Sequence, residues 1–357
     1  MNWRRRWVVA MKEKKVKRSL FESVGVHCIV DGQFGSTGKG ALAYWLAKLA
    51  AKNGYQFQGA IYSGGPNSGH TFYHEDEKHV LKQLPSFAVA TTLMGGQCSA
   101  YLSAGAVINP EILFAEAEKY PNVKIYVHPN AAIVDKWAKE AEAGTGAPGV
   151  ASTMSGTGGA LILKIARSDE AIWGSRSMSH PKNITTLKHN LHPEAELYFM
   201  EVSQGFSLGI NSEFYPYVTS RECTVMQGLA DARIPARHLA RTYMTIRTFP
   251  IRVGGNSGGW YDDQLELDWE DLGIEPELTT VTQRQRRIAT FSFHQFTDAL
   301  RANDPDFVFV NFLNYLGSSE KQDEFIFRIK DQRDETDKWF EVIGGYGPKV
   351  EDIFYIG

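Results

Sequence analysis

A glycine-rich segment lies where an apolar, strand-like run passes into a helical pattern. It runs Asp31-Gly-Gln-Phe-Gly-Ser-Thr-Gly-Lys-Gly40. A loop of this kind at the start of a helix points backbone N–H groups and the positive helix end at a phosphate. The segment departs from the Walker A pattern, because five residues separate Gly32 from Gly38 and Gly40 replaces the metal-binding Ser or Thr. We predict a phosphate-binding loop, with a purely structural turn as the alternative.

A second loop, Gly64-Gly-Pro-Asn-Ser-Gly-His-Thr71, follows another predicted strand. Open parallel sheets bind ligands at the carboxyl ends of their strands, so Asn67 and His70 would lie beside the first loop if the two strands are neighbours. A single histidine is commonly a structural residue. Because small residues flank it on a loop, His70 is also a candidate acid or base.

Strand-like and helix-like segments alternate along the chain. Strands are expected at 24–30, 60–63, 101–108 and 123–128, and helices at 41–52, 110–119 and 131–143. This alternation predicts an α/β fold with a central, mostly parallel twisted sheet flanked by helices. Further strand-like runs cover 196–202, 242–253 and 308–315, and the Gly/Ser/Thr-rich stretch 144–159 is either a linker or a ligand-binding loop.

Length and charge narrow the class of protein. The 357 residues suffice for one large domain, which we place at residues 24–357 after a basic N-terminal tail at 1–23. Without residues 1–18, the chain keeps 30 basic and 40 acidic side chains, a net charge of −10. Such a body is a poor general binder of nucleic acids, because that affinity comes from Lys and Arg contacts to phosphate. We expect no nucleic-acid partner and a phosphate site confined to a pocket.

Three cysteines, Cys28, Cys98 and Cys223, form no CxxC pair and cannot all be paired in disulfides, which suits a reducing cytosol. A zinc site built from cysteine clusters is excluded. No apolar run reaches the roughly 18 residues of a membrane span. We therefore expect a cytoplasmic protein without a membrane partner.

Both loops resemble those of the adenylosuccinate synthetases, whose phosphate loop is QWGDEGKG and whose next loop is GGHNAGHT. The corresponding segments here are Gln33–Gly40 and Gly64–Thr71. In family order, the resemblance continues through Ser155-Gly-Thr-Gly158, Lys164-Ile-Ala-Arg167, Gln204-Gly205, Tyr215-Pro-Tyr-Val-Thr-Ser220, Arg252-Val-Gly254, Thr279-Thr280, Arg286-Arg287 and Gly345-Tyr-Gly-Pro348. Several motifs in order are more specific than one glycine loop, so the chain is identified as a member of this family.

The resemblance implies a single catalytic domain with the adenylosuccinate-synthetase-like fold and a two-step ligation. The γ-phosphate of a nucleoside triphosphate passes to O6 of a 6-oxopurine nucleotide, and the amine of L-aspartate then displaces it. The purine oxygen leaves only after phosphorylation, and charge developing on it needs Mg²⁺, a lysine and an acid nearby. A homodimer is also implied, because Arg167 would reach the site of a neighbouring subunit.

The family's site residues are carried over by similarity. His70 would be the acid at O6, Lys39 with the Gly38–Gly40 amides would hold phosphate, and the Gly69 carbonyl would bind Mg²⁺. For the purine monophosphate the implied residues are Ser36, Asn67, Ser155, Thr157, Arg167, Gln204, Thr219 and Arg252. For the donor nucleotide they are Thr37, Gly38, Lys39, Gly40, Thr71, Asn314, Gly347 and Pro348. For aspartate they are Thr279, Thr280, Val281, Arg286 and Arg287, since guanidinium groups match carboxylates.

The phosphate loop departs from the family at one functional position. The family has Asp-Glu where this chain has Ser36-Thr37, and that aspartate accepts the N1 proton of the purine and binds Mg²⁺. An inactive protein is one interpretation. The other is a changed substrate, because serine is smaller and uncharged and leaves room beside C2 for the 2-amino group of guanine. Ser36 stays a candidate catalytic residue and metal ligand, and Asp31 either replaces the missing carboxylate or accepts hydrogen bonds within the turn.

The segments VDGQFGSTGKG and PIRVGGNSGG resemble a viral branch of the family, the 2-aminoadenylosuccinate synthetases. That branch implies ligation of L-aspartate to dGMP on the way to diaminopurine DNA, in the host cytoplasm; conventional use of IMP is the alternative. The family recognises the guanine of its donor with an aspartate, which Asn314 replaces here. An amide can pair with N1 and N6 of adenine, so ATP or dATP is the expected donor. A solvated Asn314, with the base held by stacking alone, is the other interpretation.

Overall fold

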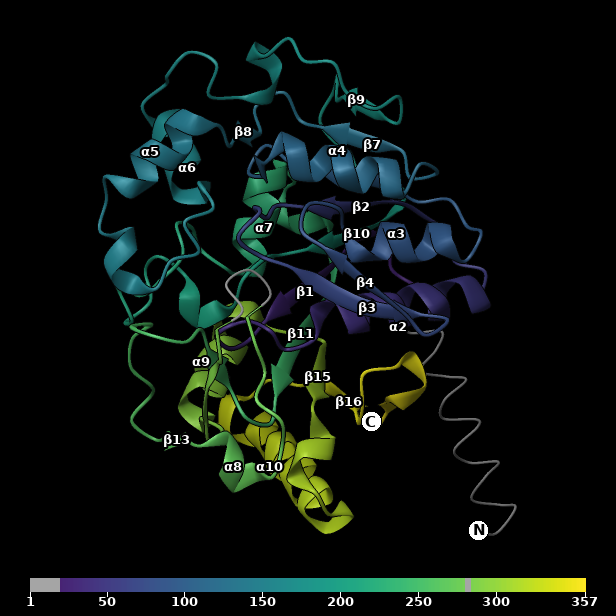
Figure 1. Cartoon of the computed structure of the whole chain (residues 1–357). Coiled ribbons are helices and arrows are strands. Elements are labelled where there is room, and N and C mark those ends of the chain that lie inside the picture. The colour runs from purple at the N-terminus through teal and green to yellow at the C-terminus, as the bar shows by residue number, and fades with distance from the viewer. Residues whose placement is uncertain (1–19, 280–283) are drawn as a thin grey trace.

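The central element is a ten-stranded sheet that crosses the molecule (Figure 1). The computed structural model describes residues 20–279 and 284–357, so most of the predicted basic tail lies outside the described residues. Neighbouring strands are parallel throughout this sheet except β16 with β17, which confirms the predicted mostly parallel sheet. In spatial order the strands are β17 (Ile353–Tyr355), β16 (Glu341–Gly345), β15 (Phe307–Asn311), β11 (Leu239–Arg247), β1 (Gly25–Asp31), β10 (Leu197–Glu201), β2 (Phe57–Tyr62), β5 (Ser99–Leu102), β7 (Ile125–Val127) and β9 (Ile184–Thr186).

Helices cover both faces of the sheet, as an α/β fold requires. One face packs against α2 (Lys39–Lys52), α3 (Ser86–Leu93) and α4 (Pro110–Lys119). The other packs against α7 (Val225–Ala232), α9 (Phe293–Asn303) and α10 (Ser319–Thr336). Two helices, α5 (Lys136–Ala143) and α6 (Thr157–Ile165), form a separate pair (Figure 1). None of the described helices is long and apolar enough to cross a membrane.

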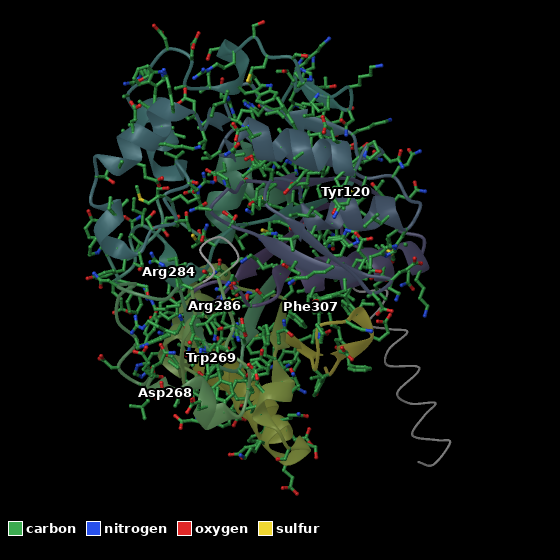
Figure 2. All side chains as sticks on the ribbon, in the orientation of Figure 1. Tyr120, Asp268, Trp269, Arg284, Arg286 and Phe307 are labelled. Carbon is green, nitrogen blue, oxygen red and sulfur yellow. The ribbon has the colours of Figure 1, made fainter. Side chains whose placement is uncertain are left out.

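Three small sheets carry loops of the candidate site. One is a hairpin of β3 (His70–His74) and β4 (Glu77–Leu81), and another pairs β6 (Val107–Ile108) with β8 (Ala132–Ile133). The third has the order β12 (Ile251–Arg252), β14 (Arg287–Ala289), β13 (Glu266–Leu267). Beside it, the indole of Trp269 in α8 (Trp269–Leu272) donates a 2.7 Å hydrogen bond to the Arg286 carbonyl, and Figure 2 shows both residues on the same side of the molecule.

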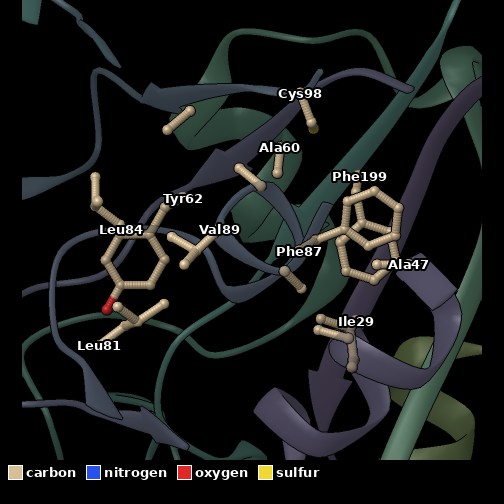
Figure 3. Close-up of a cluster of buried hydrophobic side chains, with 14 of the residues drawn as sticks. Ile29, Ala47, Ala60, Tyr62, Leu81, Leu84, Phe87, Val89, Cys98 and Phe199 are labelled. Atoms are coloured by element: carbon tan, nitrogen blue, oxygen red, sulfur yellow. The ribbon is translucent and has the colours of Figure 1, made fainter. Parts of the chain in front are cut away.

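Alternation of side chains along the strands explains why both faces need helices. Ile29 in β1 faces the cluster formed with α2 and α3, whereas its neighbours Cys28 and Val30 face the cluster formed with α7. On the first face, Phe87 of α3 stacks on Phe199 of β10 with ring centroids 4.3 Å apart (Figure 3). Strands buried on both sides are expected from continuous apolar runs such as residues 24–30.

Three of the predicted strands end earlier than expected, because turns interrupt them. The run 101–108 divides into β5 and β6, which belong to different sheets. The run 242–253 divides into β11 and β12 on either side of residues 248–250. The run 308–315 ends as a strand at Asn311, since Phe312 takes a left-handed conformation with φ of 60° and starts a 3₁₀ turn. Because β15 ends at Asn311, the polar residue Asn314 lies in a turn directly after a buried strand.

The region from 131 to 165 also differs from the sequence prediction. The predicted helix 131–143 begins only at Lys136, because the Asp135 side chain caps it by accepting the Ala138 N–H at 2.9 Å. The stretch 144–159 is neither a simple linker nor wholly a loop, since Thr157 already begins α6. Ser155 and Gly156 therefore directly precede the N-terminus of α6, which carries the positive end of the helix dipole.

The start of α2 packs directly against the hairpin of β3 and β4. A Cβ atom on Gly40 would lie 2.5 Å from the carbonyl oxygen of Thr71 and 2.8 Å from its nitrogen. Only glycine allows this approach, which brings the phosphate loop next to the strand that carries His70. We expect Gly40→Ala to lower the free energy of unfolding by about 1–3 kcal/mol, because backbone atoms must separate.

Urea unfolding measures this effect. The matched control is Gly146→Ala, where a new Cβ meets open space in the described chain and little change is expected. Equal stability of the two variants would contradict the close packing.

Candidate active site

Buried polar residues end five neighbouring parallel strands. They are Tyr62 in β2, Glu201 in β10, Asp31 in β1, Arg247 in β11 and Asn311 in β15, and each is at most 7% exposed. A buried polar group needs a hydrogen-bond partner, and each of these side chains bonds to a loop above the sheet. We call this set the strand-end row. It lies at the carboxyl edge of the sheet, where open parallel sheets bind ligands.

Asp31 organises the phosphate loop from below. Its Oδ1 accepts the backbone N–H groups of Gln33 at 2.9 Å and Gly35 at 3.2 Å. Its Oδ2 accepts from the Thr37 hydroxyl and from Lys39 Nζ, the latter at 3.1 Å. Both carboxylate oxygens are therefore engaged inside the loop, which favours the turn role over that of a replacement proton acceptor.

Lys39 is held at the mouth of the loop by a second contact. Its Nζ donates to the carbonyl oxygen of Gln204 at 2.6 Å. Gln204 takes a left-handed conformation with φ of 64°, which a non-glycine residue adopts only when its surroundings impose it. Its side-chain Nε2 is buried and has no partner among the described residues. An unpaired buried donor beside a lysine suits an anionic or carbonyl-bearing ligand.

His70 lies at the start of β3 with its ring almost completely buried. Its Nδ1 lies 2.7 Å from Glu201 Oε2, while the other carboxylate oxygen of Glu201 accepts the Phe87 N–H at 2.8 Å. Because a carboxylate only accepts, Nδ1 carries a proton. Nε2 is buried and has no partner among the described residues, so it is free to act on a ligand.

The route by which the two loops meet differs from the sequence prediction. β1 and β2 are not neighbours, since β10 lies between them. The loops nevertheless lie together, because Gly40 contacts Thr71 and because Glu201 at the end of β10 holds His70.

The residues predicted for the purine monophosphate form one group and some outliers. A Cβ atom on Gly65 would lie 3.3 Å from both Asn67 Oδ1 and Thr157 Oγ1, so those two side chains flank the same point. Ser155 joins them through a 3.0 Å contact with the Thr157 hydroxyl. Thr157 is the first residue of α6, and a helix N-terminus favours anions.

Three further predicted residues are placed differently. Arg167 is exposed just past the end of α6, on the order of 15 Å from Thr157 along the helix, so the structure does not bring the two together. Arg252 is buried over the Phe34 ring at 4.3 Å, and burial, followed by the charge of Arg287, lowers the pKa of Arg252 to about 10. Thr219 is half-buried, and its backbone N–H donates to the Leu208 carbonyl.

The residues predicted for the donor nucleotide gather around the phosphate loop and the end of β15. Gly38 takes a left-handed conformation with φ of 97° and directly precedes α2. Thr37 is buried below it, and its carbonyl accepts from Asn311 Nδ2 at 3.2 Å. Asn314 is exposed in the following 3₁₀ turn (Leu313–Leu316), and Gly347 and Pro348 follow the end of the neighbouring strand β16.

The two arginines predicted for aspartate point to different partners. Arg286 Nη1 donates to the Ser36 hydroxyl at 3.0 Å, so this arginine faces the phosphate loop. Burial lowers the pKa of Arg286, partly offset by nearby carboxylate charge. Arg287 instead forms a bidentate pair with Glu266 at 2.7 and 2.6 Å and lies over the Trp260 ring. Adjacent residues of an extended chain point to opposite sides, which explains the difference.

Residues 277–279 and 284–286 pair with each other beside the phosphate loop. Thr279 N–H donates to the Arg284 carbonyl, and the Thr279 hydroxyl accepts the Arg284 N–H, both at 2.9 Å. The predicted aspartate-binding residues Thr280 and Val281 lie outside the described residues.

The oxygen atoms predicted to bind a metal belong to Ser36 and Gly69. Among the described residues, no group of three or more His, Cys, Asp or Glu side chains is placed to hold an ion. Mg²⁺ at phosphoryl-transfer sites commonly binds one or two protein groups and completes its shell with water and phosphate oxygens. A loop with few oxygen ligands beside a phosphate cradle therefore fits a Mg²⁺ that binds together with a nucleotide.

Comparison with known proteins identifies the family. The family model described as adenylosuccinate synthetase matches residues 28–173 and 173–322, which is most of the chain. The chain belongs to the adenylosuccinate synthetase family. This confirms the resemblance found in the glycine loops and the single α/β domain that it implies.

Relatives within the family come from phages and from archaea. An N6-succino-2-amino-2'-deoxyadenylate synthase of Vibrio phage phiVC8 is 41% identical over 84% of this chain and 88% of the relative. An adenylosuccinate synthetase of a Pyrococcus species is 27% identical over 85% of this chain and 86% of the relative. A solved structure of the cyanophage S-2L succinoaminodeoxyadenylate synthetase, bound to dGMP and to dATP as an energy donor, superposes with a TM-score of 0.80 at 35% identity, over 93% of this chain and 95% of that one.

Three charged residues of the candidate site were missed by sequence reasoning. Glu201 and Arg247 each end an apolar strand-like run, and Glu277 precedes the predicted aspartate loop. A charged residue that closes a buried strand is a usable signal, because such a residue must find a partner at the sheet edge.

We expect Asp31→Asn to lower the free energy of unfolding by about 3 kcal/mol. The amide keeps one acceptor but leaves the buried Lys39 ammonium without its carboxylate. Asp135→Asn is the control. Asp135 also accepts a backbone N–H and pairs with an arginine, but it is more exposed, so the free energy of unfolding should fall by only about 1 kcal/mol. Guanidinium unfolding of both variants measures the difference, and losses in the reverse order would show that Asp31 does not hold the loop.

Proposed function

We propose that this chain is a ligase that joins L-aspartate to C6 of dGMP and gives N6-succino-2-amino-2'-deoxyadenylate. Family membership supplies the type of reaction, phosphoryl transfer to O6 followed by displacement by an amine. The observation that carries the choice of dGMP is Ser36, because the family has an aspartate there. The higher identity to the phage synthase than to the Pyrococcus enzyme supports the same choice.

Ser36 makes room at the purine edge that differs between IMP and dGMP. It is exposed at the top of the phosphate loop, and its hydroxyl contacts Arg286 rather than a carboxylate. A 2-amino group beside C2 then meets a small neutral side chain. Asn67 and Thr157 would hold the nucleotide with Ser155, Gln204, Thr219 and Arg252.

His70 is the group that we assign to O6. With its Nδ1 proton held by Glu201, the ring presents Nε2 to the site. Protonated at Nε2, it would donate a hydrogen bond and then a proton as negative charge develops on the purine oxygen. Burial of the ring and the contact with Glu201 keep its orientation fixed.

Lys39 and the amides at the start of α2 would hold the phosphates of the donor. Mg²⁺ would lie with them, held by the Gly69 carbonyl and the Ser36 hydroxyl, and when bound it supplies positive charge that offsets the phosphoryl charge. Asn314, in the 3₁₀ turn after β15, would pair with the adenine of ATP or dATP. Thr279 and Arg286 would bind the carboxylates of aspartate, with Thr280, Val281 and Arg287.

We propose a homodimer as the active form, working in the cytoplasm of an infected cell. Arg167 lies away from the monophosphate group of its own chain, which suits a role in the site of a second copy. Exposed apolar side chains on the pair of α5 and α6 support a contact there; they are Trp137, Ile162 and Ile165.

Phosphate release by the purified protein with Mg²⁺, L-aspartate and dATP tests the proposal. dGMP and IMP are compared side by side, and the succinylated product is identified by mass spectrometry. We expect turnover with dGMP and little with IMP. Preference for IMP would make the chain a conventional adenylosuccinate synthetase.

Ser36→Asp tests the residue that carries the choice of substrate. We expect kcat/KM for dGMP to fall at least tenfold and that for IMP to rise, because a carboxylate restores the family's proton acceptor and fills the space beside C2. Ser36→Ala controls for loss of the hydroxyl alone. Unchanged selectivity in Ser36→Asp would contradict the steric argument.

Glu201→Gln tests the orientation of His70. The new amide donates to Nδ1, so the ring can no longer keep a proton there while offering another from Nε2. We expect kcat to fall about a hundredfold with little change in KM for dGMP.

The matched control is Glu116→Gln, since Glu116 is also buried and accepts the backbone N–H groups of residues 82–84. Equal activity of the two variants would show that Glu201 has no specific role in the reaction.

A further inference from the structure

Arg247 is a fully buried arginine that ends β11 next to the phosphate loop. Its guanidinium makes a bidentate contact with Glu277, with Nη1 3.2 Å from Oε2 and Nη2 2.5 Å from Oε1. A bidentate pair between these groups fixes both position and angle. The planar group also lies 4.0 Å from the centroid of the Phe312 ring. Glu277 is itself mostly buried, with its side chain 24% exposed.

The main chain of Arg247 is tied to the phosphate loop as well. Its N–H donates to Gln33 Oε1 at 2.9 Å, and its carbonyl accepts from Gln33 Nε2 at 3.1 Å. The guanidinium Nη1 donates to the Ser36 carbonyl at 3.3 Å. Ser36 takes a left-handed conformation with φ of 58°, which a serine holds only when its surroundings fix it. Arg247 is one of the groups that fix it.

Glu277 begins one side of the hairpin stem, which we define as residues 277–279 and 284–286. Its carbonyl accepts the Arg286 N–H at 2.9 Å, and Leu278 pairs with Gln285 in an antiparallel bridge. Arg286, on the other side of the stem, reaches the Ser36 hydroxyl. Ser36 is therefore contacted by both arginines, one through its carbonyl and one through its side chain.

A third element joins the same pair. The Tyr315 hydroxyl, in the turn that carries Asn314, donates to Glu277 Oε1 at 3.1 Å. Burial would raise the pKa of Glu277, but the charge and hydrogen bonds of Arg247 outweigh it and lower that pKa, with Arg286 and Tyr315 adding to the effect. The carboxylate is thus held in its charged form by two segments distant in sequence, at Arg247 and Tyr315, and by Arg286 across the stem.

We propose that the Arg247–Glu277 pair is a positioning element that sets the hairpin stem, and with it Arg286, against the phosphate loop for capture of L-aspartate. The inference rests on the proposed function, because it assigns aspartate to this stem. Arg247 and Glu277 touch no reacting atom in this scheme. They act by fixing where the Arg286 guanidinium stands relative to the loop that carries Ser36.

The geometry predicts which kinetic constant responds. Without the carboxylate of Glu277, the stem loses its anchor and Arg286 loses its fixed distance from the loop. Thr157 and Asn67 belong to other segments, and Asp31 and Gln33 still hold the phosphate loop that carries Ser36, so the affinity for dGMP should be kept. A change confined to aspartate therefore distinguishes positioning from general destabilisation.

Steady-state kinetics of the full chain with Glu277→Gln tests the proposal, with dGMP, dATP and Mg²⁺ saturating and L-aspartate varied. We expect KM for aspartate to rise tenfold or more, as loss of a charged hydrogen bond predicts, while KM for dGMP stays within about twofold. Asp306→Asn is the matched control. It removes a carboxylate that lies 3.2 Å from Arg241, an arginine of the same strand β11 at the end opposite Arg247.

A milder variant tests the same contact in case Glu277→Gln fails to fold. Tyr315→Phe removes one hydrogen bond from Glu277 and keeps both charges, and we expect about a threefold rise in KM for aspartate with the same sparing of dGMP. Equal rises in both KM values, or variants that match Asp306→Asn, would overturn the positioning role. Failure of the unmodified chain to use dGMP and aspartate would instead overturn the proposed function, so the two failures are distinct.

Discussion

Burial of polar side chains at the carboxyl ends of the parallel strands is the constraint on which the rest of the site depends. Tyr62, Glu201, Asp31, Arg247 and Asn311 stand side by side where the strands end, and none is more than 7% exposed. Leaving such groups unpaired costs more than any single hydrogen bond contributes, so each must bind a loop above it. The loops are thereby fixed before a ligand arrives, and three of the five residues, Asp31, Arg247 and Asn311, hold the same phosphate loop.

Sequence patterns were sufficient for the fold and for the two glycine loops. Alternating strand and helix signals predict a mostly parallel sheet, and the loop at Asp31–Gly40 marks where phosphate would bind because its chemistry is local. The order of the strands is a different matter. β10 enters the sheet between β1 and β2 although it follows them by more than 130 residues, and no local signal carries that information. The place of Glu201 beside His70 could not be predicted for that reason.

The paired arginines illustrate a second limit. Arg286 and Arg287 are equal candidates by type and spacing, and only the structure separates them, since Arg286 turns to Ser36 and Arg287 to Glu266. Which of two neighbours faces a site depends on the register of a short strand, here β14 in its small sheet. A one-residue shift would exchange their roles, and the sequence contains nothing that excludes it.

The serine at position 36 changes the balance of charge in the site as well as the space beside the purine. Arg247 and Arg286 both contact this residue, and among the described side chains Glu277 is the carboxylate that contacts Arg247. An aspartate at position 36 would form an ion pair with Arg286 and take up that charge. With serine, the Arg286 guanidinium is held in place by a neutral hydroxyl and keeps its capacity for an anionic ligand. In the proposed scheme the substitution therefore alters two sites together, because it makes room at the purine edge and leaves Arg286 without a carboxylate at position 36.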